Sequence, residues 1–162
     1  QSRSSAASDV YKRQPYNKVY TNETGISLNL HPQDVDNHEE YNITIIQEEG
    51  HCPVSINIHP KKDSLSKVNV RIFAENNASV DCILSCYVAK DASGVDTDMQ
   101  IRSWPFDKSR IKARPEMFVL NNDIKAAHGN ALGTLSQEDR YYLHSKGITN
   151  YKQIVKESLY EK

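Results

Sequence analysis

The sequence predicts a mainly β protein that ends in a short helical tail. Segments in which apolar and polar residues alternate indicate half-buried strands, and clusters of turn-forming residues separate these segments. From Ser136 onward the apolar residues follow a helical period instead. The four clearest alternating segments are residues 42–46, 54–58, 68–73 and 80–84.

The spacing of these strands leaves two β architectures open. The strand centres recur about every 10 to 15 residues, which suits either an antiparallel sandwich or the rungs of a β-solenoid. No strict internal repeat is visible that would favour the solenoid. Turns are expected at residues 48–50, 60–63, 75–77 and 91–94.

The first residues of the chain do not share this pattern. The chain begins without methionine, and residues 9–14 are typical of a translated transposon end from library construction. We therefore expect residues 1–14 to be a disordered scar and residues 15–134 to form a β core that lacks its natural N-terminal part. Residues 135–162 are expected to form the tail.

Charge and hydropathy exclude several function classes. Residues 1–14 hold three basic residues and one acidic one, so the rest of the chain has 17 Lys and Arg against 20 Asp and Glu. A mildly acidic chain offers no basic footprint for nucleic acid or an anionic membrane. No apolar run approaches the roughly 20 residues that span a bilayer. We expect a cytoplasmic protein.

The three cysteines are Cys52, Cys82 and Cys86. An odd number without a C-x-x-C pair argues against a disulfide framework and against a structural zinc site. The spacing of four places Cys82 and Cys86 on one face of a strand. We expect them to be small buried core residues, with metal binding as the less favoured alternative.

The tail has the signals of two helices. Ser136 is a good N-cap residue, and the acidic residues in the first turn that follows interact favourably with the helix dipole. Gly147 can adopt the left-handed conformation that ends the helix. A second helix is expected from Thr149 onward. Its apolar stripe consists of Tyr151, Ile154, Val155 and Leu159. This stripe either packs against the β core and the first helix or is partly free for a partner.

The most informative segment is residues 122–133, which contains His128 and Gly129 in what reads as a glycine-flanked turn. A rung-like block precedes it, with Val95-Asp96-Thr97, Arg102 and Pro115 before an expected strand at Met117 and Val119. Together with the tail, the segment resembles the C-terminal signature of the SufB/SufD family, the scaffolds of SUF iron–sulfur cluster assembly. The positions that carry this resemblance are Asp123, His128, Gly129, Gly133, Tyr142, Leu143, Gly147 and Ile148.

The resemblance implies a right-handed parallel β-helix that pairs with a SufB-type subunit or a second copy of itself. It also implies that the tail binds a SufC-type ABC ATPase, through Tyr141, Tyr142, Leu143, Gly147 and Ile148. The chain has no phosphate-binding loop of its own, so we expect no ATP site and no enzyme activity in it.

His128 matches the family's candidate iron ligand at the subunit interface, which would contact a nascent, transient iron–sulfur cluster. Neutral imidazole is a good iron ligand, but a purely structural role in a turn stays open. The neighbouring rung, residues 99–104, offers no thiol, and this makes the chain SufD-like. The chain departs from the family by having Ser103-Trp104-Pro105-Phe106 where a run of leucines is usual. Pro105 indicates either an edge strand of the sheet or a break in the strand.

The other histidines are weaker candidates for a functional role. His31 and His38 flank a polar loop, His59 ends a strand before a proline, and His144 lies on the exposed face of the tail. His51 next to Cys52 is a weak candidate metal pair.

A second function class, a carbohydrate-active or binding β-solenoid, also stays open. It would need carboxylates clustered on one face of neighbouring rungs. The candidates, Asp81, Asp91, Asp96 and Asp98, are scattered in the sequence.

Overall fold

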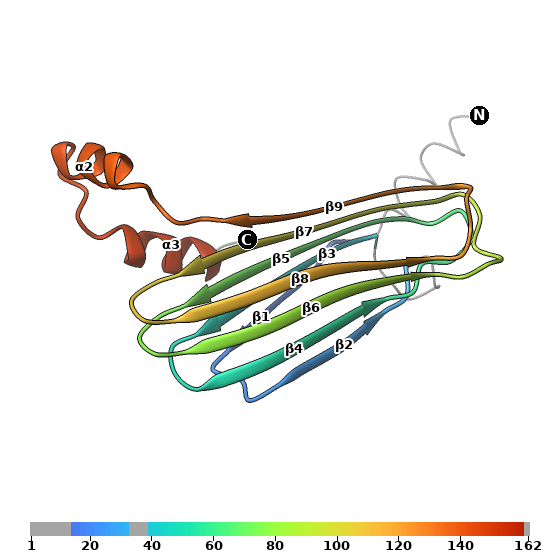
Figure 1. The fold of residues 1–162 in the computed structure, drawn as a ribbon, viewed down its shortest axis with the longest axis horizontal. Coiled ribbons are helices and arrows are strands. Elements are labelled where there is room, and N and C mark those ends of the chain that lie inside the picture. The colour runs from blue at the N-terminus through green and yellow to red at the C-terminus, as the bar shows by residue number, and fades with distance from the viewer. Residues whose placement is uncertain (1–13, 33–38, 161–162) are drawn as a thin grey trace.

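The computed structural model describes residues 14–32 and 39–160, and in this part of the chain it is a β-solenoid followed by two helices (Figure 1). The expected solenoid is therefore confirmed. Of the expected scar, residues 1–13 lie outside the described residues, and so does His38. The strands are β1 Tyr16–Thr21, β2 Ile26–Leu30, β3 Glu40–Gln47, β4 His51–Ile58, β5 Leu65–Ala74, β6 Ser79–Val88, β7 Val95–Pro105, β8 Arg110–Val119 and β9 Ile124–Leu132. The helices are α2 Gln137–Ser145 and α3 Tyr151–Tyr160.

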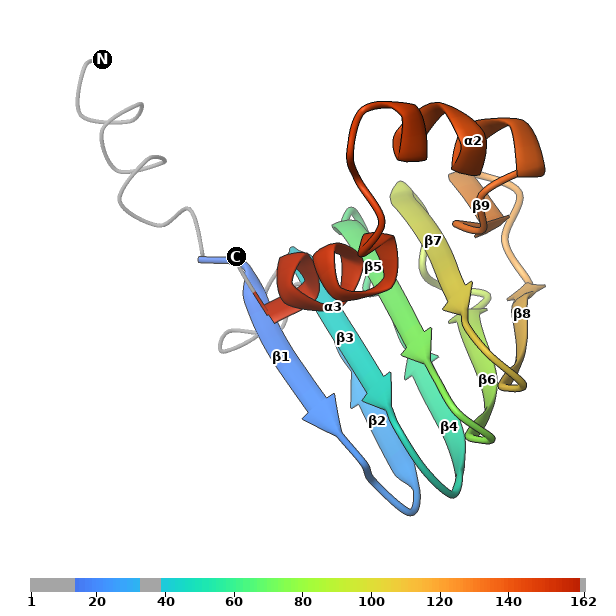
Figure 2. The same ribbon diagram turned by 90° about the vertical axis from the view of Figure 1, so that its left-hand side faces the viewer.

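The strands form two parallel sheets between which the chain alternates. The odd-numbered strands make a five-stranded sheet and the even-numbered strands a four-stranded sheet, each stacked in sequence order (Figures 1 and 2). One coil is thus an odd strand, a short turn and an even strand. Its length varies from 25 residues, between the partners Tyr16 and Tyr41, to 31, between Val68 and Met99. This explains why no strict repeat is visible in the sequence.

The core lies between the two sheets and is built from columns of side chains in register. In the five-stranded sheet, Ile43, Val70 and Ile101 form one such column, and each is at most 1% exposed. In the four-stranded sheet, Val54 and Cys82 stack in the same way. β-Branched residues dominate these columns because they pack well on a pleated, buried surface.

The corners of the coils use residues that tolerate a left-handed backbone. Asp63, Asn76 and Asp107 have φ values of 57° to 59°, and Gly94 has a φ of 72°. Aspartate and asparagine adopt this conformation more readily than other side chains. A Cβ on Gly94 would lie 2.1 Å from Oδ1 of Asp63, so the corners also stack closely. All four expected turns occur at such corners.

Three local expectations need adjustment. Residues 16–21 and 26–30 form strands that the sequence analysis did not identify. Pro115 does not precede a strand but lies within β8, which is an edge strand, where a missing N–H does not break the ladder. Pro105 is the last residue of β7, so it marks a break and not an edge.

Helix α3 packs on the outer face of the five-stranded sheet (Figure 2). Val155 and Leu159, 7% and 2% exposed, cover Ile46 and Phe73, which point outward from β3 and β5. Tyr151 packs beside them, whereas Ile154 is 44% exposed and does not belong to the buried stripe. The second helix therefore packs mainly on the side of the solenoid.

Ion pairs hold α3 to the corners of the coils. Lys156 Nζ pairs with Glu48 and lies 3.0 Å from Glu75 Oε1, and Lys152 Nζ lies 3.2 Å from Asp107 Oδ2. Burial alone would lower the pKa of Lys156, but the two carboxylates outweigh it and raise that pKa. The hydrogen bond from Lys156 in turn lowers the pKa of Glu48.

Candidate functional site

The stack of coils ends at β8 and β9, and the core is uncovered there. These two strands are the last of their sheets, and within the described residues no further strand pairs with them. Their inward columns are half-buried or exposed, in contrast to the same columns one coil earlier. We call this surface the end face. It consists of Ile111, Ala113, Pro115, Met117 and Val119 of β8 and Ile124, Ala126, His128, Asn130 and Leu132 of β9.

His128 lies in the middle of the end face. It pairs in register with Met99, which is 0% exposed in the core, so the imidazole belongs to an inward column and is exposed only because the stack ends. The expected glycine-flanked turn is therefore wrong, because residues 124–132 form a continuous strand that pairs with β7. A Cβ on Gly129 would lie 2.2 Å from Gln100 Oε1, so this glycine permits close stacking on β7.

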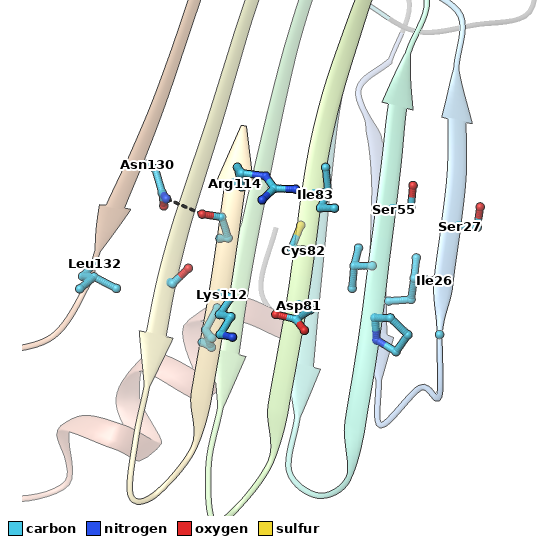
Figure 3. Close-up of a pocket in the computed structure, with 16 residues that line it drawn as sticks. Ile26, Ser27, Ser55, Asp81, Cys82, Ile83, Lys112, Arg114, Asn130 and Leu132 are labelled. Atoms are coloured by element: carbon cyan, nitrogen blue, oxygen red, sulfur yellow. Dashed lines mark hydrogen bonds between the residues drawn. The ribbon is translucent and has the colours of Figure 1, made fainter. Parts of the chain in front are cut away.

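Asn130 bridges the two sides of the end face. Its side-chain Nδ2 donates a 2.7 Å hydrogen bond to the carbonyl oxygen of Ala113, an interaction that crosses from β9 to β8 (Figure 3). The bond satisfies one backbone carbonyl of β8 and holds the two last strands together. Asn130 was not among the predicted site residues, although its spacing of two from His128 indicates that both side chains share one face of a strand.

The end face offers a single candidate metal ligand of the kind that iron prefers. The strand β9 pairs with residues 95–103 of β7, and this segment contains no thiol. Across residues 14–32 and 39–160, no three His, Cys, Asp or Glu side chains converge on a point that could hold a metal ion. The described residues therefore do not form a complete metal site around His128.

The cysteines are core residues, as expected. Cys52, Cys82 and Cys86 are free and at most 2% exposed. Burial raises the pKa of Cys82 to about 12 and that of Cys86 to about 11. Because the thiolate is the form that binds metal and attacks electrophiles, these buried thiols are inert at neutral pH.

The other described histidines take no part in the end face. His51 is exposed and lies 2.7 Å from Ser79 Oγ, whereas Cys52 points into the core, so the pair cannot converge on a metal. His59 follows β4 as expected and stacks on Tyr87, with ring centroids 5.4 Å apart. His31 directly follows β2, at the edge of the expected loop, and stacks on His59 with ring centroids 5.1 Å apart, so it is half-buried. His144 is exposed on α2.

The carboxylates considered for a glycosidase-like site do not come together. Asp81 points outward from the four-stranded sheet, and Asp96 and Asp98 belong to the five-stranded sheet on the other side of the solenoid. Asp91 lies in a corner. Asp96 and Asp98 share the outward face of β7, but Asp81 and Asp91 do not join them, so the four carboxylates do not form one cluster across neighbouring rungs.

A hollow of about 1100 Å³ lies on the four-stranded sheet. It extends along the four-stranded sheet past Ser27, Ser55 and Ile83 and reaches the end face at Asn130 and Leu132 (Figure 3). Its charged lining residues are Asp81, Lys112 and Arg114. His128 is not among the residues that line this hollow, so the hollow places no further ligand or base beside His128.

Helix α2 carries three of the five residues that are expected to bind a partner, and Gly147 and Ile148 follow it. Ser136 caps it by accepting a 3.1 Å hydrogen bond from the Asp139 N–H, and Gly147 ends it with a φ of 80°. None of its residues is buried, and Tyr141 and Tyr142 are 65% and 62% exposed. Leu143 and Ile148 are half-buried. The helix therefore presents two aromatic side chains to solvent.

No helix in the described residues is long and apolar enough to cross a membrane. A sequence model of the family described as SUF system FeS cluster assembly, SufBD core domain, matches residues 37–152. That match spans β3 to the start of α3 and includes the whole end face. No curated protein and no solved structure matches the chain significantly.

Proposed function

Since the chain belongs to the SufBD core domain family of the SUF iron–sulfur assembly system, we propose that it is a non-enzymatic scaffold subunit that pairs through its end face. The observation that carries this proposal is the position of His128, an inward-facing imidazole on the last strand. A second subunit that covers the end face would bury the imidazole at the subunit boundary and could supply the remaining iron ligands.

Physical features of the end face support pairing. β8 and β9 leave unpaired backbone donors and acceptors along their free edges, which are templates for strands of another chain. Exposed apolar side chains accompany these edges, with Val119 at 42% and Leu132 at 67% exposure. Exposed apolar side chains beside an unpaired strand edge are typical of interaction sites. The partner is a SufB-type subunit or a second copy of this chain.

In this proposal the tail binds a SufC-type ABC ATPase in the cytoplasm. Tyr141 and Tyr142 are exposed aromatic anchors, a residue type enriched in interface hot spots. Leu143 lies in the last turn of the same helix, and Gly147 and Ile148 directly follow its C-terminal end. ATP hydrolysis then belongs to the partner, because the chain contains no phosphate-binding loop.

His128→Ala tests the iron-ligand role within the assembled complex. Because His128 is exposed, we expect normal folding and assembly but a lower yield of iron–sulfur cluster. His51→Ala is the matched control, since this histidine is also exposed but lies at the start of β4, away from the end face and from α2. Equal cluster yields in the wild type and in His128→Ala would refute the ligand role.

Co-expression tests the ATPase partner. A SufC-type ATPase should co-purify with the intact chain and should be lost when residues 136–162 are deleted. If the deletion variant retains the ATPase, then the tail is not its binding site.

A further inference from the structure

The outer face of the five-stranded sheet carries a column of side-chain amides in register. Asn42 Nδ2 donates to Asn17 Oδ1 at 2.9 Å, and Asn69 Nδ2 donates to Asn42 Oδ1 at 3.0 Å. Gln100 continues the column on β7, and Gly129 occupies the same register on β9. Each bonded amide keeps a further donor or acceptor for another molecule, because a side-chain amide has two N–H groups and two lone pairs.

Two arginines form the next outward column. Arg71 of β5 and Arg102 of β7 are register partners on adjacent strands, which lie about 4.8 Å apart. Arg71 is half-buried, and its Nη2 donates a 2.9 Å hydrogen bond to the fully buried Thr44 Oγ1. Like charges directly opposite each other destabilise a sheet. This pair therefore has an electrostatic cost that an anion would remove.

No carboxylate within the described residues neutralises these arginines. None of the ion pairs found there includes Arg71 or Arg102. The nearest carboxylate on the same face of β7 is Asp98, four residues from Arg102, or about 13 Å along a strand. Asp98 accepts a 2.7 Å hydrogen bond from Gln100. Burial lowers the pKa of Arg71, and no acidic neighbour opposes this effect.

The two columns line a hollow of about 640 Å³, which we call the arginine hollow, with Asn42, Asn69, Gln100, Arg71 and Arg102 among its lining residues. The rim on β9 is Ala131, a small residue in register with Arg102, so no side chain from that strand fills the space above the guanidinium. This volume is in the range of small-molecule sites and is much larger than an isolated phosphate ion.

We propose that the arginine hollow binds a phosphate group carried by a small polar molecule. Two guanidinium groups side by side present more N–H donors than one carboxylate can accept, whereas the three terminal oxygens of a phosphate monoester can accept from both. The amide column offers hydrogen-bond donors and acceptors to the rest of the molecule. This inference is independent of the proposed scaffold role, because it uses neither the end face nor α2.

Isothermal titration calorimetry of the full chain with inorganic phosphate, at constant ionic strength in chloride buffer, tests the site. We expect saturable binding that weakens at least tenfold in Arg102→Ala. In Arg102→Lys, which keeps the charge but loses the planar fork, binding should weaken to an intermediate degree. Arg110→Ala, at the start of β8 in the other sheet, is the matched control and should bind as the wild type does. Arg102 is exposed, so its variants should keep the wild-type circular dichroism spectrum.

Ribose 5-phosphate tests the second part of the proposal, and it should bind more tightly than inorganic phosphate. The site is refuted if the wild type shows no saturable phosphate binding, or if Arg110→Ala weakens binding as much as Arg102→Ala. If ribose 5-phosphate binds no more tightly than phosphate, the amide column does not contact the ligand, and the claim of a polar carrier molecule fails.

Discussion

Leu159→Ala should release α3 from the side of the solenoid. Leu159 is 2% exposed and packs with Ile46 and Phe73 on the outer face of the five-stranded sheet. Truncating a fully buried leucine to alanine costs about 2 to 5 kcal/mol. Because Leu159 is in the last turn of its helix, where the neighbours can relax, we expect a value near the lower limit, about 2 kcal/mol.

The effect should be local, because α3 lies outside the main core. A loss of about 2 kcal/mol corresponds to an increase of roughly 30-fold in the population of detached α3, since 1.4 kcal/mol is a factor of ten. Native-state hydrogen exchange measures this directly. The amides of α3 should exchange about 30 times faster, while those of β5 and β7 should keep their protection.

The matched control is Ile154→Ala, on the same helix but 44% exposed. It removes a comparable amount of apolar side chain from a position outside the buried cluster, so its effect should be small, within about 0.5 kcal/mol. If Ile154→Ala accelerates exchange as much as Leu159→Ala, or if neither variant changes it, then α3 does not pack as described.

Three further predictions concern the tail and the core. The carboxylate of Glu48, whose pKa is lowered below its ordinary 4.5, should stabilise docked α3 above about pH 4.5 and lose this effect as the pH falls through the lowered value. Lys156, whose pKa is raised above 10.5, should contribute below that pH and lose its contribution as the pH rises through the raised value; exchange of α3 amides across the pH range measures both limits. Ser136→Ala should destabilise α2 by about 1 kcal/mol, seen as smaller helical Cα chemical shifts, and unchanged shifts would contradict the observed cap. Cys82 and Cys86 should resist iodoacetamide at pH 8 until the chain is denatured, and labelling of the native protein would show that the thiols are accessible.

Local sequence patterns identified several of the strands but not their arrangement. Local alternation at residues 42–46 and 68–73 identifies β3 and β5 because each strand buries one face. The pairing of Met99 with His128, 29 residues later, is a contact between coils that no local pattern encodes. For the same reason, the His128-Gly129 dipeptide was predicted to form a turn but lies within a strand. Its extended backbone conformation is stabilised by hydrogen bonds to β7.

The same distinction applies to the tail and to the arginine hollow. The cap at Ser136 and the stop at Gly147 follow from local chemistry and were predicted correctly. The side of the solenoid that α3 covers depends on the outward-pointing Ile46 and Phe73, which are far away in the sequence. Arg71 and Arg102 are likewise neighbours only through the parallel register of β5 and β7.

The most direct test of the central claim, that the chain pairs through its end face, compares two exposed leucines. Leu132→Asp places a charge on the end face, and Leu65→Asp places the same charge at the start of β5, away from it; the native side chains are 67% and 57% exposed. Each full-length variant is co-expressed with a SufB-type subunit, or expressed alone for self-pairing, and its mass is measured by light scattering after size exclusion. The account predicts that Leu132→Asp abolishes pairing while Leu65→Asp pairs as the wild type does. Normal pairing by Leu132→Asp, or loss of pairing by Leu65→Asp alone, would contradict it.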